Sequence, residues 1–157
     1  MVRPGVALNG VNPCPGQPNP MRAVVELQVH VLQIRNVGKG ETVGYDAAWT
    51  APRATRVAVV AAGYADGLLR SASSTDEVPG AEALIAGKRC RFAGRISMDL
   101  TAIDIGALPT NAVRRGDLVT LLGGDITVDD LADKSATIGY EVLTSLGRRY
   151  HRVYRNS

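Results

Sequence analysis

Aromatic residues are scarce in this sequence, and their scarcity limits what its core can be made of. Phe, Trp and Tyr together make up 4% of the 157 residues, with a single Phe and a single Trp. Because 45% of the residues are nevertheless hydrophobic, the core must consist mainly of Val, Leu, Ile and Ala. The length suits one domain of ordinary size together with part of a second.

Long apolar runs and clustered cysteines are also lacking. No run approaches the roughly 20 apolar residues that a membrane-spanning helix needs, and residues 1–5 do not resemble a signal peptide. Cys14 and Cys90 form no CxxC pair, which favours two buried free thiols in a reducing compartment, although a disulfide stays possible. We therefore expect a cytoplasmic protein with no membrane partner.

A large excess of charge is missing too. Eighteen basic and fifteen acidic residues give a net charge of +3. This is far from the charge of a dedicated nucleic-acid binder, so we expect no nucleic-acid partner. The excess is compatible with an anionic small ligand.

Proline, by contrast, is concentrated near the start of the chain. Four of the eight prolines fall between residues 10 and 20. Proline at this density removes backbone donors and keeps the chain extended, which is typical of a linker. We therefore predict a boundary near residue 20, with one domain spanning residues 21–157.

Beyond the linker, the dominant hydrophobic period is two. Val25, Leu27, Val29 and Val31 alternate with polar residues, and the pattern slips by one at Leu32, which predicts a strand with a bulge. Similar patterns predict further strands over 55–62, 83–86, 89–93, 96–105 and 117–122, with turns at 38–40 and 87–88. Five or six strands at this spacing indicate a small barrel or sandwich.

Helix signals occur only near the end. Thr127 and Asp130 form a capping box with Asp in place of Glu, which predicts a short helix. Thr137 is a possible cap for a second helix with Ile138, Val142 and Leu146 on one face, ending at Gly147. Residues 148–155 alternate and predict a last strand. The expected fold is mainly β, with two short helices, preceded by the tail of another domain.

Three tyrosines stand beside glycines, where a core has little need of them. These are Tyr45, Tyr64 and Tyr140. Each alternatively buries its ring and bonds its hydroxyl to the backbone. Met98, flanked by Arg95 and Asp99, is likewise either a core residue or part of a site. Asp66, Asp129, Asp130, His30 and His151 are interpreted as caps, turn formers or surface residues, so no metal site is expected.

Six motifs together resemble bacterial alanine racemases over essentially the whole chain, matching roughly the last two-fifths of a family member. They are Arg3–Leu8 (RPGVAL), Val43–Tyr45 (VGY), Gly63–Gly67 (GYADG), Gly94–Asp99 (GRISMD), Val128–Ala132 (VDDLA) and Gly139–Leu143 (GYEVL). In this family a (β/α)₈ barrel binds pyridoxal 5′-phosphate. The C-terminal β domain completes the active site of a second subunit in a head-to-tail homodimer.

The resemblance assigns roles to residues from both parts of the chain. Residues 1 to about 9 match the last barrel strand and its phosphate loop, and residues 10–20 the linker that follows. Arg3 is thereby expected to face the pyridine nitrogen of the cofactor. The backbone of Gly5 and Val6, together with Tyr140, is expected to contact its phosphate.

The same resemblance makes Tyr45 one of two catalytic bases. The Met98 amide is expected to hold the substrate carboxylate, and Tyr64, Arg70, Arg95 and again Tyr140 to line the substrate entryway. Inverting a stereocentre by proton exchange needs one base on each face. A tyrosine, with a reference pKa of about 10, acts as a base only where cationic neighbours favour its phenolate.

Two positions depart from the family pattern. Asp46 stands where the family usually has Gly, and a carboxylate pointing inward there opposes formation of a phenolate. Asn9 stands where Tyr is common. The cofactor lysine of the family has no counterpart, since Lys39, Lys88 and Lys134 fall in predicted turns or on a helix surface. The isolated chain is therefore expected to be inactive, and to self-associate through the face that a barrel domain would cover.

The sequence thus predicts part of an enzyme that interconverts L- and D-alanine and supplies D-alanine for the cell wall. A hypothesis from another class is a small basic β-barrel that binds RNA or a protein partner. Such a module is expected to place aromatic residues among basic ones on its strands. The tyrosines here lie at glycine bends instead, which favours the enzyme.

Overall fold

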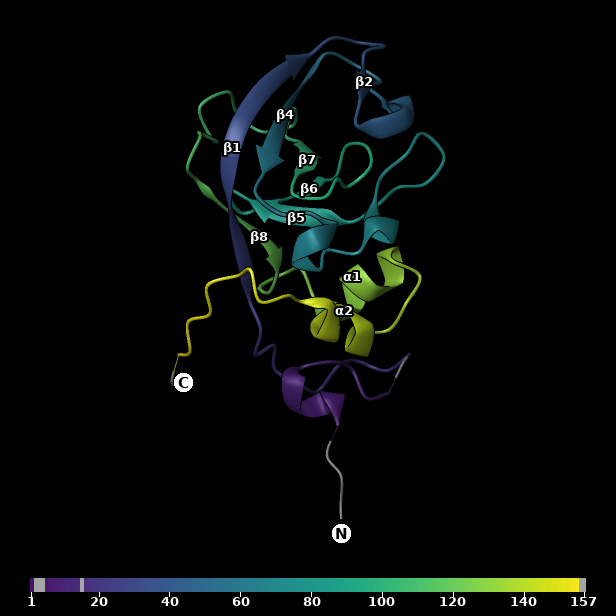
Figure 1. Cartoon of the computed structure of the whole chain (residues 1–157), viewed down its shortest axis with the longest axis vertical. Coiled ribbons are helices and arrows are strands. Elements are labelled where there is room, and N and C mark those ends of the chain that lie inside the picture. The colour runs from purple at the N-terminus through teal and green to yellow at the C-terminus, as the bar shows by residue number, and fades with distance from the viewer. Residues whose placement is uncertain (2–4, 15, 156–157) are drawn as a thin grey trace.

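Six antiparallel strands form the main sheet of the computed structural model, which describes residues 1, 5–14 and 16–155. The spatial order is β6-β5-β8-β1-β4-β7 (Figure 1). The strands are β1 (Leu27–Val37), β4 (Thr55–Val60), β5 (Glu82–Ile85), β6 (Lys88–Arg91), β7 (Thr101–Asp104) and β8 (Leu118–Leu122). A separate hairpin joins β2 (Thr42–Val43) and β3 (Trp49–Thr50).

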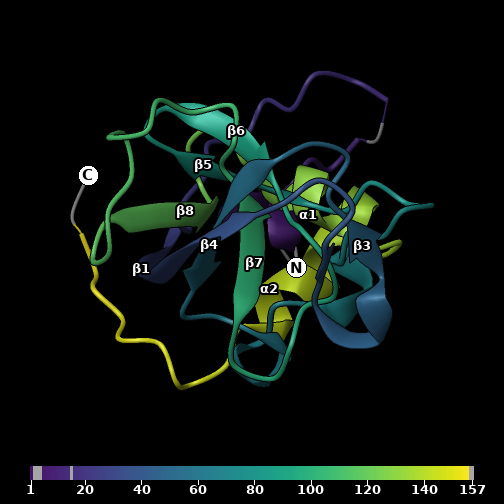
Figure 2. The same cartoon turned by 90° about the horizontal axis from the view of Figure 1, so that it is seen from above.

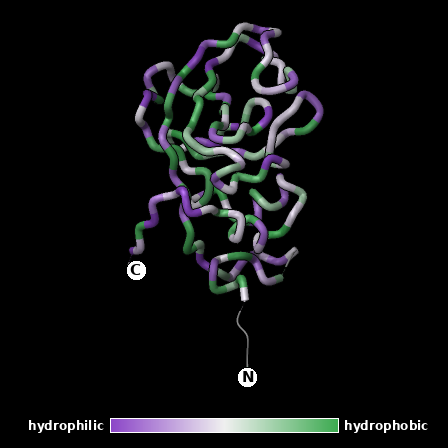
Figure 3. The backbone as a smooth tube through the Cα atoms, in the orientation of Figure 1, coloured by the Kyte–Doolittle hydropathy of each residue, from purple (hydrophilic) through white to green (hydrophobic). Residues whose placement is uncertain are grey.

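β1 is the longest strand, and it pairs with β8 along its first part and with β4 along its second. Leu27, Val29 and Val31 are buried, whereas the residues between them are exposed. The alternation along the chain can be followed in Figure 3. The register against β4 shifts between Val31 and Gln33, which confirms the predicted bulge. The extra residue lets one strand leave β8 and join β4.

The two edge strands of the sheet approach each other and nearly close it into a barrel (Figure 2). Phe92 and Ile103 form an isolated antiparallel bridge, and the Ala93 amide donates to the Ala102 carbonyl at 2.8 Å. The largest fully buried side chains include Phe92, Leu68, Ile85, Ile96, Ile103, Ile105, Leu121 and Leu122. Each such side chain contributes about 1.5–3 kcal/mol through burial, so an aliphatic core with a single Phe suffices.

The β5–β6 hairpin turns at Ala86–Gly87, one residue earlier than predicted. Both residues have positive φ, 47° and 74°, as a two-residue turn that follows the twist of its strands requires. Lys88 therefore belongs to β6 and not to the turn.

Two helices pack beside the barrel, α1 (Val128–Lys134) and α2 (Gly139–Ser145). The predicted capping box of α1 is confirmed: Asp130 N donates to Thr127 Oγ1 at 2.9 Å, and Thr127 N donates to Asp130 Oδ2 at 3.0 Å. α2 begins after Ile138, whose side chain is exposed, so the predicted apolar face keeps only Val142 fully buried.

The start of the chain packs on these helices instead of standing apart. Val6–Asn9 forms a 3₁₀ turn below α2 in Figure 1. Val6 and Val11 are buried, and the Asn12 amide donates to Asp129 Oδ2 at 3.1 Å. A Cβ on Gly139 would lie 2.7 Å from Val11 Cγ1, so the close contact with α2 depends on that glycine. The linker is thus anchored to the β domain.

Three sequence predictions were wrong. Residues 96–100 form a loop rather than the start of a strand, and residues 148–155 form no strand. Apolar and polar residues alternate in that tail, but no strand of the described residues pairs with it. Within the tail only Tyr150 is half-buried, and burial raises the pKa of its hydroxyl. Cys14 and Cys90 are both free, as expected, but Cys14 is exposed. Burial raises the pKa of the Cys90 thiol.

Within the described residues, neither helix is long and apolar enough to cross a membrane.

Candidate active site

The segment between Phe92 and β7 is the centre of the candidate site. Ile96 is buried in the core and anchors the segment, whereas Met98 is 53% exposed. Ser97 closes a tight turn: its amide donates to the Leu100 carbonyl at 3.0 Å, and its Oγ accepts from the Leu100 amide at 3.1 Å. Among the described residues no acceptor is found for the Met98 amide, so this donor can serve a ligand.

The turn that carries Tyr64 is joined to this segment through its backbone. Tyr64 N donates to the Ser97 carbonyl at 3.0 Å and Ala65 N to the Met98 carbonyl at 2.9 Å. A Cβ on Gly63 would lie 2.3 Å from both carbonyl oxygens, so no larger residue fits there. The Tyr64 ring remains 43% exposed. Glycine beside this tyrosine therefore serves a close backbone approach.

The turn that carries Tyr45 meets the same segment from another direction. A Cβ on Gly44 would lie 2.9 Å from Arg95 N, and one on Gly94 would lie 2.4 Å from the Val43 carbonyl oxygen. Tyr45 is 64% exposed, so its hydroxyl does not serve to satisfy the core. The segment from Gly94 to Leu100 thus makes close backbone contacts with both the Tyr45 turn and the Tyr64 turn.

Asp46 does not point into the barrel. Its side chain is 71% exposed, and Oδ2 lies 3.3 Å from Arg95 Nε. The buried Nε makes no well-formed hydrogen bond among the described residues, so the contact is an electrostatic pair. Asp46 adopts φ 62°, a left-handed conformation that suits Gly and is tolerated by Asp. The carboxylate that replaces the family's usual Gly therefore does not point inward; it is paired with the Arg95 guanidinium beside Tyr45.

Arg70 belongs to the same group of residues. Ser73 Oγ donates to the Arg70 carbonyl at 2.5 Å and accepts from Ile96 N at 2.9 Å, which ties the Arg70 turn to the central segment. Arg70 and Arg95 line a hollow of about 410 Å³ with Ser71, Ser73, Thr75 and Val78. Two of the predicted entryway residues therefore share one cavity.

Gly5 and Val6, in the N-terminal segment, form a second group with Tyr140 of α2. A Cβ on Gly5 would lie 3.4 Å from the Tyr140 hydroxyl, so the two predicted phosphate contacts are adjacent. Val6 is buried and holds the segment, while Tyr140 is 53% exposed. Arg3 lies outside the described residues.

The two groups are connected through the end of α2. Gly147 N donates to the Asp66 carbonyl at 3.0 Å, and a Cβ on Gly67 would lie 1.9 Å from the Ser145 carbonyl oxygen. The structure therefore gathers Tyr45, Tyr64, Arg70, Arg95 and Met98 in one group, and places Gly5, Val6 and Tyr140 in another.

Several supporting residues were missed by sequence reasoning. Arg149 lies close to two carboxylates: Nε is 3.1 Å from Asp66 Oδ1, and Nη2 is 2.8 Å from Asp99 Oδ1. Asp99 and then Asp66 raise the pKa of the Arg149 guanidinium. Asp76 accepts from the Thr50 amide at 2.6 Å and from its hydroxyl at 2.7 Å, which holds the hairpin of Tyr45. The partners in these pairs are 26 to 83 positions apart in the sequence, so no local pattern indicated that they would meet.

Of the aspartates interpreted as caps and turn formers, Asp66 and Asp130 have those roles, whereas Asp129 accepts from the distant Asn12 amide. Buried Asp66 accepts from the Gly63 amide at 2.9 Å, and Asp130 caps α1. No cluster of metal-ligating side chains is found among the described residues. His30 is exposed, with Nδ1 2.9 Å from the Gly116 carbonyl oxygen.

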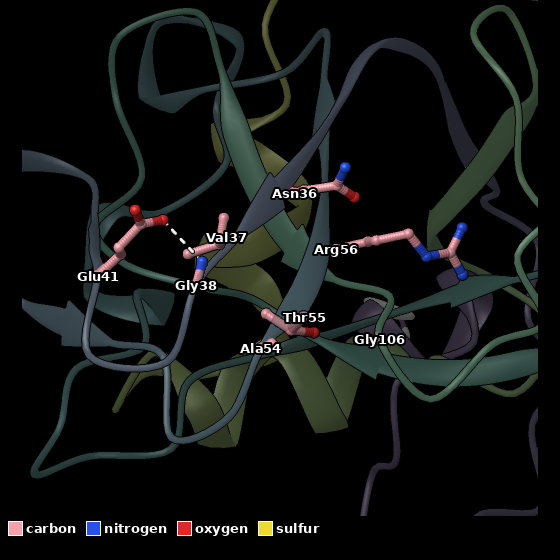
Figure 4. A pocket seen from close by; sticks show the side chains of 8 residues that line it. All are labelled: Asn36, Val37, Gly38, Glu41, Ala54, Thr55, Arg56 and Gly106. Carbon is pink, nitrogen blue, oxygen red and sulfur yellow. Dashed lines mark hydrogen bonds between the residues drawn. The ribbon is translucent and has the colours of Figure 1, made fainter.

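A larger hollow of about 490 Å³ lies at the opposite end of the β4–β7 ladder, near Gly106 and Thr55. Figure 4 shows Glu41 directed to Gly38, whose amide donates to it at 2.7 Å, and Arg56 extending away from the other lining residues. The Arg56 guanidinium donates to the carbonyls of Leu108 and Thr110 at 2.7 and 2.9 Å. The charged groups of Arg56 and Glu41 are thus bound to the protein's own backbone.

Comparisons with known proteins point to a single family for this chain. Residues 24–154 match the family described as "Alanine racemase, C-terminal domain". The alanine racemase of Methylobacterium sp. (strain 4-46) is 51% identical over 154 residues, which cover 98% of this chain and 41% of that protein. A catabolic alanine racemase of Mesorhizobium japonicum is 48% identical, with 98% and 39% covered.

Solved structures give the same result. Biosynthetic alanine racemase from Pseudomonas aeruginosa matches with a TM-score of 0.89 and 37% identity, covering 99% of this chain and 42% of that one. Alanine racemase from Bartonella henselae, with covalently bound pyridoxal phosphate, matches with a TM-score of 0.87 and 37% identity over 98% and 41%. The chain spans about two-fifths of the length of these relatives.

The hypothesis of a small RNA- or protein-binding barrel is not favoured by these findings. Its expected pattern is absent from the described strands, because Tyr45, Tyr64 and Tyr140 lie in turns and at a helix start. The family match, the identities and the barrel-like sheet all agree: the chain belongs to the alanine racemase family and carries its C-terminal domain.

Proposed function

We propose that this chain supplies the C-terminal domain of an alanine racemase, in which Tyr45 exchanges a proton with the α-carbon of alanine. One observation carries the proposal. The segment Gly94–Leu100 contacts both the Tyr45 turn and the Tyr64 turn, and it carries the Arg95 guanidinium and the Met98 amide, for which the described residues offer no acceptor. An exposed tyrosine, a cation and a free amide donor are what removal of a proton beside a carboxylate needs.

Reversal of configuration requires a proton acceptor on one face of the α-carbon and a donor on the other. In this proposal Tyr45 acts at its hydroxyl oxygen on one face, and the second group comes from the barrel domain. The Met98 amide binds the substrate carboxylate and so fixes which face meets Tyr45. Arg95 lies beside the Tyr45 turn, where its guanidinium is paired with Asp46.

The described residues fit a phosphate of the proposed cofactor, pyridoxal 5′-phosphate. Gly5 has no side chain between its backbone and the Tyr140 hydroxyl, and both residues face solvent. The amides at Gly5 and Val6 and the hydroxyl of Tyr140 are therefore the groups that would bind it, with Arg3 expected at the ring nitrogen. When bound, the cofactor would withdraw electrons from the substrate and make the α-proton removable.

The proposed assembly is a cytoplasmic homodimer with two active sites. The two groups of residues described above belong to different active sites of this dimer. Gly5 and Val6 lie on the segment that the resemblance matches to the end of the barrel domain, and Tyr140 of α2 is adjacent to Gly5. In this proposal the three residues therefore serve that domain's cofactor. The Tyr45 group lies apart from them and serves the partner subunit. D-Alanine for the cell wall is the proposed product.

The test joins this chain to the barrel portion of the Methylobacterium relative and measures racemisation in both directions by circular dichroism. Tyr45→Phe keeps the ring and removes the hydroxyl, so we expect a loss of about 10²–10⁴-fold. The loss should be unequal between L- and D-alanine, because each base removes a proton from one enantiomer.

The control is Glu41→Gln, in the opposite hollow, which should leave turnover unchanged. The chain alone is expected to be inactive and to show no absorbance band of lysine-bound pyridoxal phosphate. Near-normal turnover of the Tyr45→Phe enzyme in both directions would assign the tyrosine a structural role and overturn the proposal.

A further inference from the structure

We propose that Arg149 is a positioning residue, which sets the place of the Met98 amide and of Tyr64 by bridging Asp66 and Asp99. The inference rests on the proposed function for its catalytic consequence, but its structural content concerns this chain alone. Arg149 lies in the tail after α2, outside every motif that carried the family resemblance.

The first half of the bridge is a buried carboxylate. Asp66 is 7% exposed, and its Oδ2 accepts from the Gly63 amide at 2.9 Å, which closes the Tyr64 turn. Its Oδ1 lies 3.1 Å from Arg149 Nε. Taking away the guanidinium leaves a buried charge without its cation, which is strongly unfavourable. The Tyr64 turn therefore depends on Arg149.

The second half of the bridge reaches the loop of Met98. Arg149 Nη2 donates to Asp99 Oδ1 at 2.8 Å. Asp99 follows Met98 directly, and the Met98 carbonyl in turn accepts from Ala65 N at 2.9 Å. The guanidinium thus ties together from outside two loops that the backbone ties together from inside.

Arginine is suited to this role because its planar fork offers several donors at fixed angles, whereas an ammonium group is a single point charge. The chain beyond α2 is also held in place, since Gly147 N donates to the Asp66 carbonyl. The bridge therefore joins three segments: residues 63–67, 97–100 and 145–149. A shift of any of them displaces the Met98 amide relative to Tyr64.

The test is hydrogen exchange of the Tyr64 and Ala65 amides in the full chain, without cofactor. In Arg149→Met we expect these amides to exchange at least about tenfold faster, while amides of the β1–β4 ladder keep their rates, because local opening is independent of global unfolding. Arg152→Met is the control: it removes a charge from the same tail, where Nη2 contacts the carbonyls of Leu146 and Gly147 at 3.4 Å, and should change neither set.

Asp99→Asn is the second variant, since it leaves the buried Asp66 paired and weakens only the contact with the Met98 loop. It should accelerate the same two amides to a smaller extent, and Arg149→Lys should restore part of their protection. Unchanged exchange at Tyr64 and Ala65 in Arg149→Met, or equal acceleration of these amides and the β1–β4 ladder, would overturn the inference.

In the joined enzyme, Asp99→Asn and Arg149→Lys should raise KM for alanine more than they lower kcat, because the Met98 amide is displaced while Tyr45 keeps its hydroxyl. An effect on kcat alone contradicts the inference. If the unmodified joined enzyme does not racemise alanine, the proposed function fails, while the exchange experiment still decides the role of Arg149.

Discussion

Polar side chains at the Thr55 end of the β4–β7 ladder are bound by nearby groups, whereas the loops at the Val60 end leave some side chains exposed. Asp104 Oδ1 accepts from the Gly106 amide at 2.9 Å and from the Thr55 hydroxyl. At the other end, Tyr64 and Met98 are exposed on loops held by their backbones.

The difference shows how this fold separates stability from chemistry. Side chains satisfy the backbone at the Thr55 end, so they are not available to a ligand. At the Val60 end, close backbone approaches that require glycine hold the loops, Asp66 and Ser97 close their own turns, and the side chains of Tyr64 and Met98 remain available. The candidate site is therefore not at the larger hollow. It lies where Tyr64 and Met98 are exposed on loops that the backbone holds in place.

Gly63→Ala should have the largest effect, because it disrupts the backbone contacts that hold the loops at the Val60 end. The new Cβ would meet two carbonyl oxygens at 2.3 Å, and backbone cannot yield as a flexible side chain can. We expect a loss of about 3 kcal/mol or more of unfolding free energy, at the upper end for overpacking, measured by urea denaturation. Gly40→Ala is the control, because its Cβ would meet open space and only its φ of 83° is unfavourable, at about 1 kcal/mol. Equal losses would contradict this account.

Arg56→Met should mainly lower stability, whereas Arg95→Met should mainly lower turnover. Arg56 donates to backbone carbonyls at 2.7 and 2.9 Å, so its replacement should cost about 1–3 kcal/mol of stability and leave racemisation by the joined enzyme unchanged. Arg95 pairs with the exposed carboxylate of Asp46, so its replacement should cost below about 1 kcal/mol and lower turnover. Urea midpoints and turnover, measured on both variants, decide the matter; similar profiles would erase the distinction between the two ends.

Substitutions of Asp46 should have a smaller effect and separate charge from backbone. Asp46→Asn keeps a residue that tolerates φ 62° and removes the charge, with an expected change within about 0.5 kcal/mol. Asp46→Gly also removes the left-handed strain and should be the more stable of the two. Thermal midpoints at low and high salt test this. A large loss in Asp46→Asn that persists at high salt would show that the pair is more than a surface contact.

The smallest of these effects is expected from acid, which should weaken the contact between Asp76 and Thr50 that holds the hairpin of Tyr45. Hydrogen bonds from the Thr50 amide and then its hydroxyl lower the pKa of Asp76 below its usual value of 3.8. Because the folded pKa is depressed, the stabilisation is complete above about pH 4 and is lost as the pH falls through the lower folded value. Nuclear magnetic resonance titration of the Asp76 carboxyl, with exchange of the Thr50 amide, measures it. Asp76→Asn should remove the dependence, and a Thr50 amide insensitive to pH in the unmodified chain would contradict the prediction.

Local patterns in the sequence predicted much of the fold. The alternation of β1, the slip at Leu32 and the capping box of Thr127 each depend on residues within a few positions of one another, so each was visible in the sequence. The loop at 96–100 was missed because Ile96 is buried like a strand residue, although the chain there closes on Ser97. The tail at 148–155 alternates, but no described strand pairs with it.

The candidate site residues were predicted from the sequence, because the motifs around Tyr45, Tyr64, Met98 and Tyr140 resemble those of one enzyme family. Which of these residues lie together follows from the tertiary structure. Barrel closure between Phe92 and Ile103 brings the central segment to both tyrosine turns, and Arg149 reaches carboxylates 50 and 83 positions away. Contacts at such separations follow from packing of the whole chain, which burial of the core drives and no local pattern encodes.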